Sequence, residues 1–577
     1  MDEYDFGILI IYGTETGNSE DYAFQLFDQL KHLTNVLISE ADSLSDFNII
    51  SSAKYLVFVV STSGQGTEPR NFKKFWKFLL NTSIPNTWLQ RTSCAVLALG
   101  DSIYQRYNYC GKRLYRRLLQ FGCKMLTPLC LANEEDPNGS DTQALPWIET
   151  IVMKMKNFFP DVLRPKLVEI YTVHIKFYDI IEASYFGSLT PVTTLACSIL
   201  DNKRITDADH FQQINLIDVE NRRNVQWVAG SVLRVFPKNE LSLVSKLESL
   251  LEIDCHKKFN IKFSNGHPIE FVTLHDLFVD HLDINAVPKR RFFQRLSQIS
   301  AHSVEKERLD ELSSSHNLED YYSYCCRSRR NHFEVLRDFP NTSLQLTLID
   351  VANLIPRMKP RDYSICSSFE SANSPISIIV SLVKYRTVIK EPRYGTCSRY
   401  LCNLLPGDQL SCEIIHTDLK FPDPQTSSIL VATGTGCASI HAFLQSLPCD
   451  TPRSKHLVFL GFRFEKNLNR NQEKDYLFRE DWERFNKKNI EIFTAFSRDQ
   501  SNKIYVQHRL IEQGKIVWKY IQNGCYIIVT GGSKRMPDDV YDAFRSIVCE
   551  NGHMSVDEAS RFMQKLERIG RYQTETY

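Results

Sequence analysis

The chain reads Ile8-Leu9-Ile10-Ile11-Tyr12-Gly13-Thr14-Glu15-Thr16-Gly17-Asn18-Ser19 close to its start. The first five of these residues are apolar and predict a buried strand, and apolar residues at 23, 24, 26, 27 and 30 predict a helix over 20–33. The turn between them combines glycines with hydroxyl and amide side chains. Because free backbone N–H groups and the helix dipole both favour an anion, the turn suits a phosphate monoester. Taken alone, it could equally be a well-capped strand-to-helix loop.

The same arrangement recurs twice further along the chain. Apolar runs at 55–60 and 94–99 predict buried strands, and polar turns that contain glycine follow them at 61–69 and 100–104. Strand, turn and helix repeated at this spacing predict a parallel, doubly wound sheet, in which ligands bind outside the carboxyl ends of the strands. Three such turns at one edge favour a bound cofactor over three coincidental turns.

These turns resemble those of flavodoxin-like FMN domains. The resemblance implies that residues 14–19 bind the phosphate, that the other two turns enclose the flavin ring, and that Tyr104 stacks on it. Position 63 is serine where membrane-bound cytochrome P450 reductases carry a second stacking tyrosine, so one flavin face would be less shielded. The residues assigned to FMN by this likeness are Thr14, Glu15, Thr16, Gly17, Asn18, Ser19, Ser61, Thr62, Ser63, Gly64, Leu99, Gly100, Asp101, Ser102, Ile103, Tyr104, Gln105, Arg106, Tyr107, Asn108 and Glu134.

The middle of the chain has a different period. The short, proline-punctuated segment 158–165 predicts a linker, about which we expect hinge motion. Strand-like runs follow at 170–175, 193–200 and 225–235, and a helical, charge-rich stretch at about 241–339 interrupts the pattern. This order predicts an antiparallel β-barrel with a helical insertion.

Two segments downstream of the insertion suit a second flavin. Arg361-Asp362-Tyr363-Ser364 offers a rigid fork for a pyrophosphate and a flat ring, although an ordinary edge strand would read the same way. Gly395-Thr396-Cys397-Ser398 predicts a helix start suited to the same anion. The pair resembles the RxYS and GxCS elements of the ferredoxin–NADP reductase superfamily, which implies that Arg361 and Ser398 hold the pyrophosphate, Tyr363 packs on the flavin and Ser364 lies near its N5. The residues assigned to FAD are Arg329, Arg361, Asp362, Tyr363, Ser364, Gly395, Thr396, Cys397 and Ser398.

The last third repeats the strand-and-turn pattern. Strand-like runs at 428–432, 492–496 and 526–529 each precede a polar turn, and the basic turn at 497–503 carries the charge that the 2′-phosphate of NADP needs. A solvated basic turn is the alternative. The three turns resemble the nicotinamide module of diflavin reductases, which implies NADPH contacts by Thr435, Ser497, Arg498, Lys503, Ile504, Tyr505, Val506, Gln507 and Asp539. Residues 432–441 lack both prolines and the arginine of that family's loop, and Thr530 matches its cysteine that assists hydride transfer, so we expect lower affinity or slower hydride transfer.

The chain ends with Arg571-Tyr572-Gln573-Thr574-Glu575-Thr576-Tyr577. Such a polar end is commonly a frayed terminus. In the resembling family, however, a terminal aromatic lies on the FAD ring and must move before nicotinamide can stack. Tyr577 fits that position and Glu575 matches a nearby acidic residue, so Ser364, Glu575 and Tyr577 are the candidate catalytic residues.

Bulk composition narrows the class of protein. A length of 577 residues indicates several domains, and 69 basic against 68 acidic residues give no support to a nucleic-acid partner. The acidic start does not resemble a targeting segment, and no apolar run is long enough for a membrane anchor. Sixteen cysteines without CxxC pairs or metal-like spacing favour reduced thiols in the cytoplasm over disulfides or a metal site.

Together these segments predict a multidomain α/β protein. We expect a flavodoxin-like FMN domain at 1–155, a linker at 156–166, an FAD-binding antiparallel β-barrel with its helical insertion at 167–418, and a ferredoxin–NADP reductase-like NADPH domain at 419–577. The whole chain resembles the diflavin reductase family, which implies electron flow from NADPH through FAD and FMN to a protein acceptor. Residues 99–108, 112–120 and 573–576 carry a likeness to the cytosolic branch, whose partner is an anamorsin-type iron–sulfur protein in cytosolic iron–sulfur cluster assembly. A soluble reductase for a haem protein such as a cytochrome P450, and a flavin-binding scaffold with impaired NADPH oxidation, are the alternatives.

Overall fold

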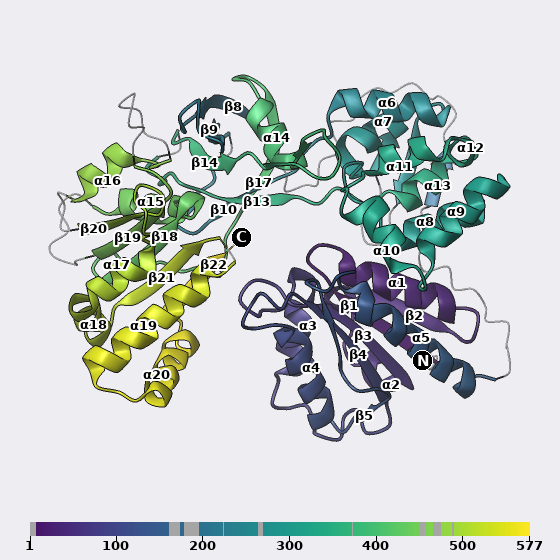
Figure 1. Ribbon diagram of the computed structural model, residues 1–577, viewed down its shortest axis with the longest axis horizontal. Coiled ribbons are helices and arrows are strands. Elements are labelled where there is room, and N and C mark those ends of the chain that lie inside the picture. The colour runs from purple at the N-terminus through teal and green to yellow at the C-terminus, as the bar shows by residue number, and fades with distance from the viewer. Residues whose placement is uncertain are drawn as a thin grey trace. The chain divides into compact units, whose positions relative to one another are not determined.

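The computed structural model describes residues 7–160, 174–177, 195–222, 224–262, 269–371, 373–448, 456–465, 475–486, 490–532 and 534–576. Residues 161–166 of the predicted linker and the predicted catalytic residue Tyr577 lie outside these ranges. The chain divides into two compact units (Figure 1). The first unit comprises Met1–Tyr185, Leu241–Arg357 and Thr387–Ile389, and the second comprises Phe186–Glu240, Met358–Arg386 and Lys390–Tyr577.

The first unit begins with a parallel sheet of order β2-β1-β3-β4-β5, with β6 also paired to β4. Its strands are β1 (Ile8–Gly13), β2 (Val36–Glu40), β3 (Tyr55–Ser61), β4 (Ser93–Gly100), β5 (Lys124–Met125) and β6 (Cys130–Asn133). The central strands are continuous apolar runs because helices cover both faces. On one face lie α1 (Asn18–Leu30) and α5 (Asp141–Phe158). On the other lie α2 (Ile49–Ser52), α3 (Lys73–Leu79) and α4 (Tyr109–Gln120).

The rest of the first unit is a helical insert with an apolar core of its own. Its helices are α6 (Leu241–Leu251), α7 (Leu274–Asp276), α8 (Arg290–Ile299), α9 (Ser303–Ser313), α10 (Leu318–Tyr321), α11 (His332–Asp338), α12 (Pro340–Ser343) and α13 (Leu348–Leu354). A small antiparallel sheet of order β12-β11-β7 joins it, with β7 (His174–Phe177), β11 (Phe259–Lys262) and β12 (Ile269–Val272). The prediction that the first strand after the linker belongs to the barrel is wrong for β7, because alternation within one strand does not specify its partner.

The second unit begins with an antiparallel sheet of order β13-β10-β17-β8-β9-β14. Its strands are β8 (Leu195–Arg204), β9 (Ile214–Val219), β10 (Val232–Val235), β13 (Arg361–Ser364), β14 (Ile376–Ser381) and β17 (Gln409–Ile415). An antiparallel bridge between Ile365 and Ile378 connects the two edge strands, so the sheet closes on itself as the predicted barrel. A two-stranded hairpin, β15 (Lys384–Tyr385) and β16 (Arg393–Tyr394), and helix α14 (Thr396–Asn403) accompany it.

The predicted strand at 225–235 forms only from Val232 onward. The preceding segment is irregular, yet Trp227 is buried and its indole N–H donates to the Ser367 carbonyl at 2.9 Å. Apolar residues in a loop that packs into the barrel core therefore gave the strand-like pattern.

The second unit ends with a parallel sheet of order β20-β19-β18-β21-β22. Its strands are β18 (Ser428–Thr433), β19 (His456–Phe462), β20 (Ile490–Phe496), β21 (Tyr526–Gly531) and β22 (Tyr572–Thr576). One face packs on α17 (Val506–Glu512), α18 (Gly514–Gln522), α19 (Met536–Gly552) and α20 (Val556–Arg568). The other packs on α15 (Cys437–Ser446) and α16 (Arg479–Asn486) together with barrel residues. The polar tail is therefore an edge strand of this sheet, paired in parallel with β21.

One expectation about the cysteines is wrong. The structure joins Cys94 and Cys123 in a disulfide, with their Cα atoms 6.4 Å apart. Both residues are buried, and the parallel pairing of β4 with β5 brings these two positions together although 29 residues separate them in sequence. Cysteine spacing alone could not reveal this pair, because the contact arises from strand pairing.

Candidate functional site

The turn between β1 and α1 is built to receive an anion. Gly17 adopts a left-handed conformation (φ 97°) just before α1, and its N–H donates to Thr14 Oγ1 at 2.9 Å. The Thr14 N–H donates in turn to Asn71 Oδ1 at 2.8 Å. Ser19 is fully buried, and its hydroxyl has no hydrogen-bond partner among the described residues. A phosphate oxygen would satisfy this hydroxyl at the helix N-terminus, so the turn fits the phosphate of FMN.

Asn71 was not predicted as a site residue, although it holds the phosphate turn. It lies in a short helical turn at Arg70–Phe72, where Arg70 forms an ion pair with Glu15 at 2.7 Å. Asn71 also donates to Glu40 at the end of β2. The sequence carries no spacing signal for this residue, because it reaches the turn from a different strand-to-helix connection.

The two other predicted FMN turns lie at the same carboxyl edge of the sheet. The turn after β3 is closed by paired backbone hydrogen bonds between Ser63 and Thr67, at 3.0 and 2.9 Å. It is connected to the turn after β4 by the Thr62 N–H, which donates to the Leu99 carbonyl at 2.9 Å. Asn108 ends the latter turn in a left-handed conformation (φ 54°). The parallel order of β1, β3 and β4 thus brings the three turns together as the edge rule predicts.

Side chains at this edge differ in their exposure. Tyr104 is half-buried, whereas Ile103 is 41% exposed. Glu134, after β6, donates its N–H to the Gly100 carbonyl at 2.9 Å and accepts from the Ser140 hydroxyl at 2.9 Å. The turn after β4 therefore presents the half-buried rings of Tyr104 and Tyr107 and the exposed apolar side chain of Ile103.

The predicted FAD residues of the second unit gather where β13 meets α14. Ser398, near the start of α14, accepts from the Val383 N–H and donates to the Gly395 carbonyl, both at 3.1 Å. Asp362 accepts two bonds from Arg234, at 2.9 and 3.1 Å, and so has a partner within the barrel. Burial raises the pKa of the Tyr363 hydroxyl, with a further increase from the Cys397 thiol beside it. Arg329 belongs to the first unit, in a left-handed conformation (φ 53°).

Two of the three predicted catalytic residues lie side by side. The Ser364 hydroxyl at the end of β13 donates to Glu575 Oε2 at 3.5 Å. Burial raises the pKa of the Glu575 carboxyl to about 7, partly offset by this hydrogen bond. Because β22 pairs with β21, Glu575 is also opposite Thr530 in the register. The carboxyl can therefore take up or release a proton near neutral pH beside a hydroxyl group.

The turn after β18 packs directly on the turn after β21. A Cβ atom added to Gly436 would lie 2.6 Å from Gly531 Cα, so only glycine fits this approach. Thr530 is fully buried, and its hydroxyl donates to the Gly436 carbonyl at 2.7 Å. Thr530 thus fixes the turn that carries the half-buried residue Thr435.

The predicted 2′-phosphate site contains a second arginine that the sequence did not indicate. The Arg498 N–H donates to the Arg463 carbonyl at 2.8 Å, and both guanidinium groups lie over the ring of Phe211, at 5.6 and 4.6 Å. Burial lowers the pKa of Arg463, and the charge of Arg498 lowers it further. An anion between these two cations would relieve their repulsion. The sequence signal that could have identified Arg463 is its position directly after a strand, in Gly461-Phe462-Arg463.

The other predicted residues of this region follow β20. Ser497 donates its N–H to the Phe462 carbonyl at 3.0 Å, and Gln507 donates to Asp539 Oδ2 at 3.2 Å. Tyr505 is 41% exposed just before α17, which begins at the buried Val506. Lys503 is exposed and Ile504 half-buried between β20 and α17.

The family's lost arginine is replaced by a buried histidine. His441 in α15 contacts Asp481 Oδ2 at 2.7 Å and the Cys366 carbonyl at 2.8 Å, and its ring stacks on Phe478 with centroids 4.0 Å apart. The hydrogen bond from His441 lowers the pKa of Asp481. The His441–Asp481 pair holds α15 to α16. His441 therefore stabilises the helix that follows the turn after β18.

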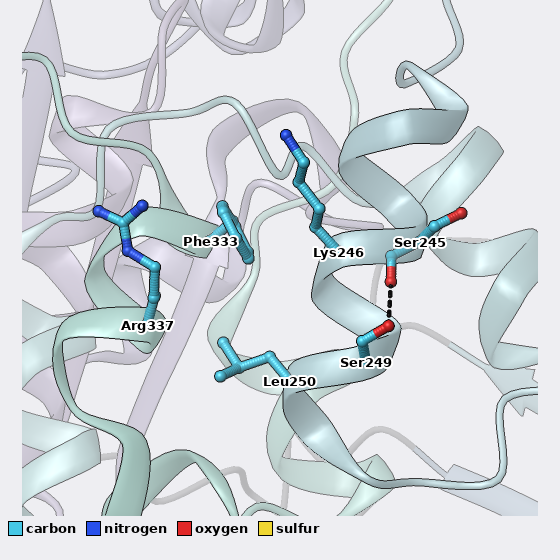
Figure 2. Close-up of a pocket in the computed structure, with 6 residues that line it drawn as sticks. All are labelled: Ser245, Lys246, Ser249, Leu250, Phe333 and Arg337. Atoms are coloured by element: carbon cyan, nitrogen blue, oxygen red, sulfur yellow. Dashed lines mark hydrogen bonds between the residues drawn. The ribbon is translucent and has the colours of Figure 1, made fainter.

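A hollow on the helical insert is separate from all of these residues. Figure 2 shows the residues that line it: Ser245, Lys246, Ser249, Leu250, Phe333 and Arg337. The hollow is open to solvent and has a volume of about 420 Å³. The Ser249 hydroxyl bonds the Ser245 carbonyl at 2.9 Å within α6. No predicted cofactor residue lines this hollow.

Comparison with protein families agrees with the three predicted modules. Residues 10–147 match the flavodoxin family, residues 190–400 match the FAD binding domain, and residues 430–542 match the oxidoreductase NAD-binding domain. Modules for FMN, FAD and a nicotinamide nucleotide in this order define a diflavin oxidoreductase.

Relatives of full length identify the family. The chain is 33% identical to NADPH-dependent diflavin oxidoreductase 1 of Danio rerio over 99% of both chains. It is 30% identical to that of Candida albicans over 99% of both chains, and 31% identical to that of Arabidopsis thaliana over the full length of both. The chain belongs to the NADPH-dependent diflavin oxidoreductase family and uses FMN, FAD and NADPH. In the part of the chain that the structure describes, no helix combines the length and apolar character needed to cross a membrane.

Proposed function

We propose that this diflavin oxidoreductase delivers its electrons to an anamorsin-type iron–sulfur protein in cytosolic iron–sulfur cluster assembly. The likeness of residues 99–108, 112–120 and 573–576 to the cytosolic branch supports this acceptor. One structural observation favours a protein acceptor at this edge. Ile103 and Tyr109, in and just after the flavin turn that follows β4, are each 41% exposed and offer apolar contact area beside the flavin.

We further propose roles for the chain's own residues. NADPH supplies a hydride to bound FAD, and bound FMN releases electrons singly. Arg498 and Arg463 bind the 2′-phosphate and so select NADPH over NADH. Glu575 takes up and releases a proton beside the FAD site, while its Oε2 accepts the hydrogen bond from the Ser364 hydroxyl.

The FMN turn holds the phosphate through its backbone N–H groups and the buried Ser19 hydroxyl. We also propose that the domains meet at residues 155, 166 and 418. Residues 158–165 act as a hinge that moves after the flavins are reduced and before the acceptor is reduced.

The test is anaerobic stopped-flow absorbance with the full chain. We expect NADPH to bleach both flavins much faster than NADH does, and the reduced protein then to reduce an oxidised anamorsin-type [2Fe–2S] protein. A Tyr109→Ser variant, which changes no residue assigned to FMN, should slow acceptor reduction while leaving flavin bleaching unchanged. Ile511→Ser, at a similarly exposed apolar side chain of α17, is the control. Electron transfer to cytochrome b5 but not to the iron–sulfur protein would refute the proposed acceptor and favour the haem-protein alternative.

A further inference from the structure

Three consecutive basic residues, the N-cap Lys289 and the first two residues Arg290 and Arg291, lie at the start of helix α8 of the helical insert. All three contact helix α1 or α5 of the flavodoxin-like domain. Arg290 Nε donates to Asp141 Oδ2 at 2.6 Å, and Arg291 Nε donates to Asp28 Oδ2 at 2.8 Å. Each of these two arginines therefore pairs with a carboxylate of the flavodoxin-like domain.

Lys289 differs from its two neighbours in its partner. Its ammonium donates to the side-chain oxygen of Asn18 at 2.6 Å, and Asn18 is a neutral residue of the phosphate turn itself. Next to it in that turn, the buried Ser19 hydroxyl has no partner among the described residues. An exposed cation and a buried unpaired hydroxyl thus adjoin the same turn from two different parts of the chain.

We propose that Lys289 is a ligand of the FMN phosphate, contributed to the flavodoxin-like domain by the helical insert. The phosphate supplies Lys289 with a hydrogen-bonding anion, as Asp141 and Asp28 do for Arg290 and Arg291. The flavin site is then completed only when α8 is docked against α1. This inference rests on FMN as the cofactor and is independent of the acceptor.

A half-buried carboxyl close to the turn supports the need for this cation. Asp21 lies in the first turn of α1, and burial raises its pKa to about 6 while the charge of Lys289 lowers it. The FMN phosphate adds negative charge to a place that already holds Asp21. A cation that serves both groups reduces their repulsion.

If docking of α8 strengthens FMN binding, FMN binding must in turn stabilise docked α8. If α8 contributes a phosphate ligand, then FMN must stabilise the docked position of α8 by the same factor by which docking strengthens FMN binding. Riboflavin has the same ring but lacks the phosphate, so it should not produce this effect.

The test compares FMN and riboflavin binding by calorimetry in the full chain, loaded with FAD and depleted of FMN. Lys289→Ala should raise the Kd for FMN about fivefold to tenfold, as for a partly exposed charged hydrogen bond, and leave the Kd for riboflavin unchanged. Lys289→Arg should restore FMN binding. Lys306→Ala removes the same charge from exposed α9 and should change neither constant.

Hydrogen exchange gives a second readout. FMN should protect the amides of α8 more than riboflavin does in the wild type, and this difference should vanish in Lys289→Ala. An unchanged Kd for FMN, an equal weakening of FMN and riboflavin, or failure of Lys289→Arg to restore binding would each overturn the proposal. None of these outcomes depends on which protein accepts the electrons.

Discussion

Arg290→Met should loosen the first unit, because Arg290 is the centre of a buried polar network. Its side chain is 3% exposed and that of Asp141 is 8% exposed. Besides the bond to Asp141, Arg290 donates to the carbonyls of Leu312 and Ser314 at 3.1 and 3.0 Å, and its guanidinium lies 4.3 Å from the centroid of the Tyr321 ring. Methionine restores most of the apolar volume but none of these bonds.

The free-energy cost of Arg290→Met is set by the Asp141 carboxylate, which loses its cationic partner. Asp141 would remain buried with only the Tyr22 hydroxyl as its other side-chain partner among the described residues. Breaking a buried ion pair by removing one partner costs about 3–5 kcal/mol, since the other charge is left uncompensated. Arg308→Met is the control: Arg308 is 42% exposed and paired on the surface, so its loss should cost less than about 1 kcal/mol.

Hydrogen exchange is the appropriate assay, because a chain with several domains does not unfold in one step. The opening free energy of amides in α5 and α8 should fall by about 3–5 kcal/mol in Arg290→Met and stay constant in the second unit. The double variant with Asp141→Asn should lose clearly less than the sum of the single variants, since it leaves no unpaired charge. A loss below about 1 kcal/mol, or strict additivity in the double variant, would refute this account of the interface.

Three further outcomes follow from the second unit. Glu575 has a pKa of about 7 in the fold against an ordinary 4.5, so the stability that its protonated form contributes is complete below pH 4.5 and is lost as pH rises through about 7. The opening free energy of amides in β21 and β22, measured by hydrogen exchange at pH 5 and 8, should show Glu575→Gln gaining up to about 3 kcal/mol over wild type at pH 8. The same difference between the two proteins at both pH values would contradict the burial of this carboxyl. Gly436→Ala should destabilise the second unit by about 1–3 kcal/mol through its clash with Gly531. Gly532→Ala should have no such cost, because a Cβ atom there meets no atom within 4 Å. Equal melting temperatures of the two variants would exclude the close approach. Arg498→Ala should raise the KM for NADPH at least about tenfold with little change for NADH, and steady-state kinetics with both nucleotides would reveal an equal loss if Arg498 were only structural.

Local patterns were sufficient for the regular core. Continuous apolar runs predicted β1, β3, β4, β18 and β21, because strands covered on both faces must be apolar along their whole length. The mostly apolar run at 492–496 predicted β20, although this strand lies at the edge of its sheet. The turns that follow them carry glycine and hydroxyl residues at helix starts, so the position of the cofactor edge could be predicted as well. These features depend on residues adjacent in sequence.

Elements that depend on distant partners were either missed or assigned to the wrong sheet. β22 is polar and lies at the edge of its sheet, so only pairing with β21 identifies it as a strand. β7 pairs with β11, more than eighty residues further along the chain, and the bond between Cys94 and Cys123 arises from strand pairing. In each case the strand's own residues are compatible with more than one partner.

The sequence by itself determined the class of this protein, because cofactor-binding turns are short, contiguous and chemically distinctive. Only the tertiary structure decided which side chains from other segments complete those turns. Asn71 and Lys289 reach the predicted FMN phosphate turn, and Arg463 reaches the predicted 2′-phosphate turn, from neighbouring elements. Glu575 meets Ser364 across 211 residues of chain. Such contacts have no sequence period, since the packing of helices and strands, not the spacing of residues, sets the distance between them.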